Sequence, residues 1–203
     1  MSIIKLDPPA GFRVARYQAK LLRTAPMQRG AFNMVEHRLD YGGDLWTAEW
    51  EIARNLIADG SDLFAWCECL MDTSAVARLY SPLGADGRQG NSSAATLTTR
   101  AAVMAGARNV PVAGGVAGES PRAGSYLSID DRMYLLRQTV TFDADGKADL
   151  GLSPRIRSAV NSGATIQCAE VRSLWRLNEP VEFNRSGSKT SGPVVLSLSE
   201  ARV

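Results

Sequence analysis

The sequence predicts a mainly β protein, a sandwich or a barrel, with one α-helix near residues 61–73. Residues 45–53 alternate strictly between apolar and polar side chains, which is the pattern of a strand with one buried face. Residues 123–154 contain short apolar runs separated by tight-turn signals, as antiparallel β structure does. Only one stretch of the chain repeats its apolar residues convincingly at helical spacing. We expect about eight to ten strands in total.

The first thirty residues are expected to form an extended N-terminal arm, because they have weak periodicity and contain three prolines. Within this arm, residues 14–22 are read as one short strand or a helical turn. Order is expected to begin with a strand over residues 34–39. A glycine-containing turn at residues 41–44 then joins it to the strand at residues 45–53, so the two strands are predicted to pair as a hairpin.

The predicted helix has a side chain suited to capping at its start, either Asp59 or Ser61. Its apolar residues recur three and four positions apart, which places them on one face. The helix is expected to end near residues 72–74, and a strand over residues 75–80 follows it. The candidate core residues of the helix are Leu63, Trp66 and Leu70.

A Gly-, Asn- and Ser-rich loop at residues 84–93 is the candidate boundary between two lobes. One lobe is predicted to comprise residues 1–83 and 172–203, and residues 84–171 to form an inserted β lobe. The segment at residues 106–118 is glycine-rich and is read as loose. The strands expected after the boundary cover residues 94–104, 126–129, 132–142, 147–152, 165–171, 174–177 and 194–200. Further candidate core residues are Leu136, Val140, Leu196 and Leu198.

Composition sets limits on the class of protein. The chain has 203 residues and a net charge of +2, which gives no argument for binding nucleic acid or a membrane surface. Residues 1–38 carry seven Lys or Arg against two Asp or Glu, a net of +5, which is either a solvated face or a surface for an acidic partner. No apolar run approaches the ~20 residues that span a bilayer, and no signal peptide is recognised. An odd number of cysteines, three, favours synthesis in a reducing compartment, the cytoplasm.

Catalytic and metal-binding patterns are weak throughout, so neither an enzyme nor a cofactor is expected. The single histidine, His37, lies in a predicted strand without a nucleophile motif. Cys67 and Cys69 lie on the predicted helix, where side chains two positions apart diverge and cannot hold one metal ion. The serine–lysine spacing at residues 186–189 falls in a Ser- and Gly-rich loop, and the paired aspartates near residues 130 and 143 fall in predicted turns.

Three segments carry a resemblance to a known family. Residues 42–50 contain a Gly-Gly-Asp-x-Trp strand start, residues 124–157 read GSYLSIDDRMYLLRQTVTFDADGKADLGLSPRIR, and residues 196–201 end in Ser-Glu-Ala. This order resembles the distal tail (Dit-like) or minor tail proteins at the tail tip of long-tailed bacteriophages. The middle segment is the most specific; it has Ser125 where the family pattern usually has aspartate.

The resemblance implies a β-sandwich belt lobe with a helix on one face, and an inserted β lobe. It also implies a ring, usually hexameric, in the virion that joins the tail tube to the hub and to fibre or receptor-binding components. DNA passes through such a ring during ejection, and no membrane insertion is involved. The candidate subunit-interface residues are Arg13, Arg16, Arg23, Arg29, Trp46 and Trp50. Deletion of residues 2–30 is expected to abolish the ring and leave a folded lobe.

Two other functions stay open from the sequence. A carbohydrate- or receptor-binding β module would show exposed aromatic residues on the inserted lobe, whereas four buried tryptophans would argue against it. An enzyme would require a pocket that joins His37 to an acid and a nucleophile.

Overall fold

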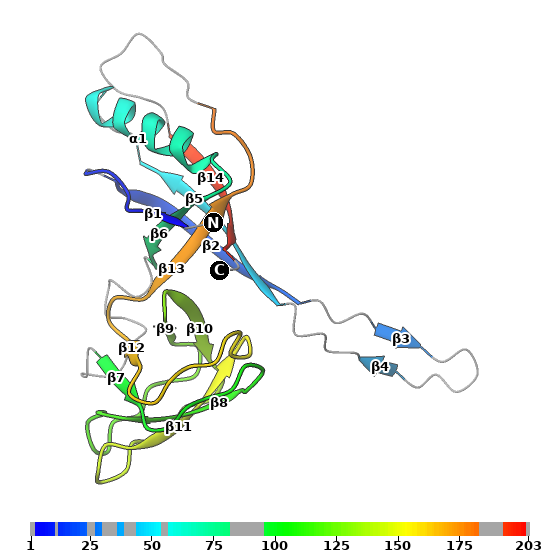
Figure 1. The fold of residues 1–203 in the computed structure, drawn as a ribbon, viewed down its shortest axis with the longest axis vertical. Coiled ribbons are helices and arrows are strands. Elements are labelled where there is room, and N and C mark those ends of the chain that lie inside the picture. The colour runs from blue at the N-terminus through cyan, green and yellow to red at the C-terminus, as the bar shows by residue number, and fades with distance from the viewer. Residues whose placement is uncertain are drawn as a thin grey trace.

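The structure, a computed structural model, describes residues 3–10, 12–23, 27–29, 36–38, 44–53, 57–81, 96–182 and 193–201. Of residues 27–29, 36–38 and 57–60 it describes the backbone alone. These parts form a six-stranded sheet, a closed barrel of six strands, one helix and a two-stranded hairpin (Figure 1). The prediction of a mainly β protein with one helix is confirmed.

The elements follow one another along the chain as β1 (Ile4–Leu6), β2 (Val14–Leu22), β3 (Met27–Arg29), β4 (Glu36–Arg38), β5 (Leu45–Ile52), α1 (Ile57–Leu70), β6 (Ala75–Tyr80), β7 (Thr96–Thr99), β8 (Asn109–Ala113), β9 (Tyr126–Ile129), β10 (Arg132–Leu136), β11 (Ala148–Ser153), β12 (Thr165–Gln167), β13 (Arg172–Leu177) and β14 (Val194–Glu200). The sheet takes its strands from residues 4–80 and 172–200, and the barrel takes its strands from residues 96–167. The division into two lobes stays a prediction, and this grouping of strands supports it.

The six-stranded sheet has the order β1-β6-β13-β14-β5-β2. All its neighbours are antiparallel except β1 and β6. The alternation predicted for β5 is observed, because Trp46, Ala48, Trp50 and Ile52 are buried on one face. The two edges differ: β1 has three residues and β2 has nine.

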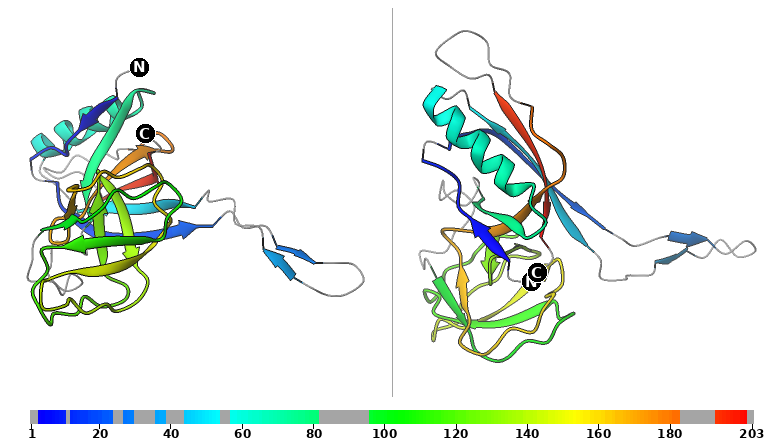
Figure 2. Two further views of the ribbon diagram at one scale, coloured as in Figure 1. Left: turned by 60° about the horizontal axis from the view of Figure 1, so that its bottom comes forward. Right: turned by 45° about the horizontal axis from the view of Figure 1, so that its top comes forward.

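Helix α1 lies across the buried face of this sheet and supplies Leu63, Trp66 and Leu70 to the core, all buried (Figure 2). The helix begins at Ile57 and ends at Leu70, so Asp59 and Ser61 lie inside it and neither caps it. Gly60 also lies inside the helix, where the cost of about 1 kcal/mol for a glycine is small beside the burial of one large side chain.

The barrel closes in the order β10-β11-β8-β7-β12-β9. Its interior is filled by apolar side chains from all six strands, among them Leu97, Val112, Ile129, Leu136, Leu152 and Ile166. The barrel is therefore a packed core rather than a container for a ligand. Val140, half-buried, packs against the same cluster.

The turn between β9 and β10 consists of Asp130 and Asp131, since Ile129 pairs with Arg132. Both aspartates have positive φ, 50° and 57°, which is the conformation of a two-residue type I′ hairpin turn. Their role as turn residues follows from this geometry.

The barrel packs against the sheet through β9 and β10. Met133 belongs to the buried core of the sheet, and Tyr126 and Leu135 are half-buried against it. The chain leaves the sheet after β6 to form the barrel and returns to the sheet at β13, where Arg172 pairs with Tyr80 of β6. The two ends of the inserted segment are therefore neighbours in the sheet.

Several expectations for the N-terminal half are corrected by the structure. β2 is a full strand of the sheet with the bounds predicted for residues 14–22, and β1 also belongs to the sheet, so both are parts of the sheet rather than of a free arm. β4 pairs with β3, and β5 pairs with β2 and β14, so the predicted hairpin of residues 34–39 with 45–53 does not form. Fourteen strands are present in the described residues, more than expected, and β8 lies in the segment read as loose.

Candidate assembly surface

The strand β2 forms an open edge of the six-stranded sheet. It pairs with β5 along its length, and no described strand pairs with its other side. The side chains of Tyr17, Ala19 and Leu21 pack against the core of the sheet and are half-buried. β2 therefore presents unpaired backbone groups beside a half-covered apolar row, which is a surface suited to another strand.

The predicted cationic residues lie on or next to this edge. Arg13, Arg16 and Arg23 are exposed, whereas the side chain of Arg29 on β3 is not described. Arg16 lies opposite Glu51 in the register of β2 and β5. Arg16 and Glu51 also line a shallow hollow of about 150 Å³ on the outer face of the sheet, together with Gln18, Glu49 and Val195. Cations and carboxylates are interleaved here, so this face is not a uniform positive stripe.

The two tryptophans proposed for an interface lie elsewhere. Trp46 and Trp50 are 3% and 1% exposed, and both belong to the core of the sheet. The ring of Tyr17 meets the Trp50 ring edge-on at 5.2 Å between centroids. Alternation along β5 points both indoles toward the core rather than outward, so neither offers a surface to a neighbouring subunit. Trp66 and Trp175, at 8% and 1%, are also buried.

A two-stranded hairpin projects from the sheet beyond the end of β2 and the start of β5 (Figure 1). We call β3 and β4 the projecting hairpin. Its backbone register pairs Met27 with Arg38 and Arg29 with Glu36. An isolated pair of short strands is marginally stable in water, so this hairpin is a natural contact for another molecule.

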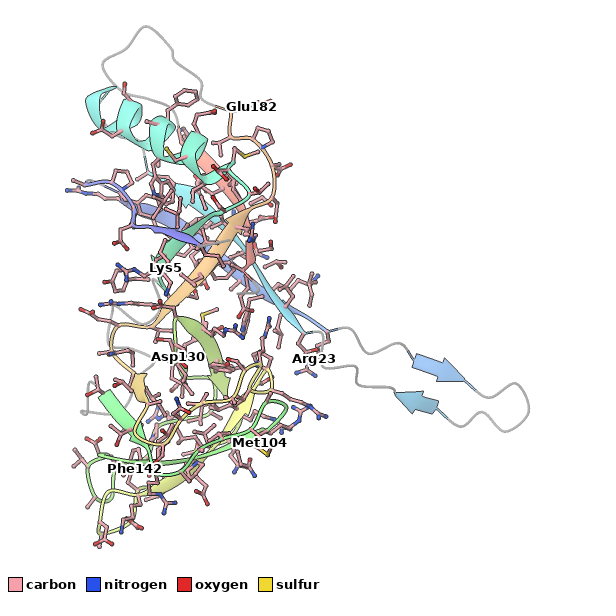
Figure 3. All side chains as sticks on the ribbon, in the orientation of Figure 1. Lys5, Arg23, Met104, Asp130, Phe142 and Glu182 are labelled. Carbon is pink, nitrogen blue, oxygen red and sulfur yellow. The ribbon has the colours of Figure 1, made fainter. Side chains whose placement is uncertain are left out.

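A charged cavity lies where the barrel meets the sheet (Figure 3 labels Lys5 and Asp130 beside it). Its volume is about 350 Å³. Lys5 Nζ lies 2.6 Å from Asp131 Oδ2. The guanidinium of Arg172 lies 4.7 Å from the centre of the Tyr80 ring and forms an ion pair with Glu170. Both cations already have partners within the chain, and the Lys5–Asp131 pair joins β1 of the sheet to the β9–β10 turn of the barrel.

The candidate reactive groups that the structure describes are the three cysteines, and they form no site. Cys67 is buried, and burial raises the pKa of its thiol to about 12. Cys168, in the barrel segment, is buried as well, with its pKa raised to about 11. Cys69 is exposed. No cluster of three or more His, Cys, Asp or Glu side chains that could hold a metal ion occurs in the described part of the chain. The side chain of His37 and residues 186–189 lie outside the described residues.

Sequence reasoning missed the contacts that join barrel and sheet. The ion pair of Arg157 with Glu200 is the most buried of them, with side-chain exposures of 13% and 2%. These residues lie far apart in the sequence, so no local pattern could have indicated the pair. The signal available was a glutamate on the apolar face of an otherwise alternating final strand.

No family model matches this chain, and no curated protein sequence matches it. No helix in the described residues has both the length and the apolar run needed to cross a membrane.

Proposed function

We propose that this chain is a structural subunit of the tail tip of a long-tailed bacteriophage. In this proposal, copies of the chain form a ring, hexameric as in the family it resembles, within the virion. The observation that carries the proposal is the open edge of β2, which leads directly into the projecting hairpin. The resemblance in residues 124–157 supplies the viral context.

An open edge of this length calls for a partner. Proteins protect edge strands with charged side chains, prolines, β-bulges, a very short strand or a covering element. Of these devices β2 has two charged residues, Arg16 and Lys20, and a bulge at its start between Val14 and Arg16, but its nine residues contain no proline and no described element covers them. A strand or loop of a second copy would satisfy its backbone groups and cover the half-buried row of Tyr17, Ala19 and Leu21.

The two edges of the sheet also favour a head-to-tail contact. The edge at β1 has three residues in parallel register, whereas the edge at β2 has nine in antiparallel register. Unlike surfaces that complement each other give a heterologous interface, which closes into a ring when the rotation between subunits permits it. The neighbours expected for such a ring are the tail tube, the hub and a fibre or receptor-binding protein, with DNA passing through the centre.

A binding module for carbohydrate or receptor is the alternative function. No structural observation favours it, because all four tryptophans are buried and the barrel interior is packed. The proposed ring would be made in the host cytoplasm without a cofactor or a catalytic step.

The deletion of residues 2–30 is no longer a clean test. It would remove β1 and β2, two of the six strands of the sheet, and expose Trp50. The register offers a better variant: because Leu22 pairs with Leu45, residues 24–43 can be replaced by Asn-Gly, with Arg23 and Asp44 facing each other across a two-residue turn.

Native mass spectrometry of the purified chain is expected to show a hexamer. The Asn-Gly variant is expected to be a monomer, and its far-ultraviolet circular dichroism spectrum should still be that of a folded β protein. The control is a chain that lacks the exposed barrel pair of Arg100 and Asp149, which should still assemble. A full-length chain that stays monomeric at high concentration would contradict the ring. A monomer that binds glycan would favour the alternative.

A further inference from the structure

The barrel contacts the sheet at the point where the projecting hairpin returns to it. β5 begins at Leu45, and Asp44 is the described residue that precedes it. Arg157, from the segment after β11, donates a hydrogen bond to the carbonyl oxygen of Asp44. The same guanidinium lies 2.8 Å from Glu200 Oε2 on β14. One barrel side chain thus binds both the base of the hairpin and the neighbouring strand.

Two further bonds fix the same short stretch of β5. The backbone N–H of Trp46 donates to Glu200 Oε2 at 3.3 Å. The indole Nε1–H of Trp46 donates to the carbonyl oxygen of Met133, on β10 of the barrel, at 3.1 Å. The Trp46 ring also lies against Tyr126, with 5.9 Å between ring centroids. The start of β5 is therefore held from the barrel side by both backbone and side chain.

Charge and geometry make Arg157 the central residue of this junction. Glu200 is 2% exposed, and a carboxylate so deeply buried needs a charged partner. Both bonds come from Nη2 of Arg157, whose two hydrogens point in fixed directions in the plane of the guanidinium, one to a carboxylate and one to a carbonyl. A lysine would keep the charge and could donate to both, but from a flexible stem without this fixed plane.

We propose that Arg157 is a positioning residue that couples the barrel to the projecting hairpin. A displacement of the barrel relative to the sheet would pull on Asp44 and Trp46 and change the direction in which the hairpin leaves the sheet. The consequence for assembly rests on the proposed function: contact of a partner with the barrel would alter how the hairpin meets a neighbouring subunit.

The test measures the distance between two spin labels by pulsed electron paramagnetic resonance. Labels are placed at Gln28→Cys on β3 and Ser197→Cys on β14, in a chain with Cys69→Ser so that the remaining native thiols are buried. Labelled protein is diluted with unlabelled protein so that the distances measured lie within one chain. The parent is expected to give a narrower distance distribution than a variant that lacks the Arg157–Glu200 pair.

Arg157→Met alone would leave the buried Glu200 carboxylate without a cation. It is therefore combined with Glu200→Met, which replaces the buried ion pair by apolar groups that a core tolerates. The double variant is expected to widen the distribution at least twofold and to speed hydrogen exchange at residues 45–47. The distribution width of Arg157→Lys should lie between those of the parent and the double variant. Arg100→Met, which breaks an exposed barrel pair, is the matched control and should leave the distribution unchanged.

A folded double variant with the distribution of the parent would overturn the coupling. A parent distribution that is already as broad as that of the double variant would overturn it as well. Neither result bears on ring formation, which native mass spectrometry of the unlabelled chain decides separately.

Discussion

A close approach between two glycines of the barrel permits a quantitative prediction. Gly146 ends the turn between residue 142 and β11, with a φ of +70°. Asp143 Oδ1 holds this turn by accepting the backbone N–H groups of Asp145 and Lys147 at 2.9 and 2.7 Å. A Cβ atom added to Gly146 would lie 2.2 Å from the carbonyl oxygen of Gly115, so Gly146→Ala requires the backbone to move by about 1 Å to reach normal contact.

Two costs add in this variant, and a second glycine separates them. The left-handed conformation costs an alanine roughly 1–2 kcal/mol, partly offset by the smaller entropy of its unfolded chain. Gly163 has a φ of +80° with no atom within 4 Å of the added Cβ, so Gly163→Ala carries this cost alone, about 1 kcal/mol. Gly146→Ala adds an overpacking cost of about 1–3 kcal/mol. We expect a total of about 2–4 kcal/mol for Gly146→Ala.

Urea denaturation of the two variants and the parent measures the difference, with hydrogen exchange of barrel amides to locate it. For a chain of this size, the larger loss corresponds to a fall in Tm of roughly 5–15 °C. Equal destabilisation by Gly146→Ala and Gly163→Ala would refute the argument from the close approach, because only the backbone conformation is common to both.

Three further results are expected. The hydrogen bond from Arg78 lowers the pKa of Asp7. The pair therefore stabilises the fold at a pH above the ordinary carboxyl pKa, and this stabilisation is lost as the pH falls through the lowered pKa. Asp7→Asn should flatten the fall in stability below about pH 4, as urea denaturation from pH 7 to 2 would measure. A thiol reagent at pH 8 should modify Cys69 in the native protein and the two buried cysteines after unfolding, as mass spectrometry of peptides would show; rapid labelling of all three would contradict their burial. Asp130→Gly should keep or raise stability by up to about 1 kcal/mol, and Asp130→Val should lower it by about 1–2 kcal/mol, since the turn needs positive φ; equal denaturation midpoints would count against this.

The strands that the sequence located well are those with a decisive local pattern. β6, β9 and β14 agree with the predicted bounds residue for residue, and β5 differs by one. In each of them, alternation or a short apolar run marks the strand, so the information is local. The helix was placed correctly, but it ends at Leu70 rather than near residues 72–74, and it starts at Ile57 rather than near residue 61 because packing of its apolar face outweighs Gly60.

The elements that the sequence left open or missed depend on distant partners. From the sequence alone, residues 14–22 are one short strand or a helical turn; β2 has these bounds, and pairing with β5, whose pattern is strong, decides for the strand. β8 was hidden by flanking glycines, yet it pairs with β11 and buries Val110 and Val112. The sequence makes Trp46 and Trp50 interface candidates for a related reason: the buried face of a tryptophan on an alternating strand is decided by the whole sheet. The arginine candidates stay a prediction.

The insertion of the barrel has a consequence for how such a protein can diversify. Ser81 N–H donates to the carbonyl oxygen of Val171 at 2.8 Å, so the chain leaves and re-enters the sheet at adjacent points. A gene segment of different length could therefore be exchanged here by recombination while the register of β6 and β13 is kept. A new inserted domain would have to supply two contacts that the present barrel provides: a cation that pairs with Glu200 and an apolar side chain that packs against Trp46. Those two requirements define which foreign domains this sheet could accept.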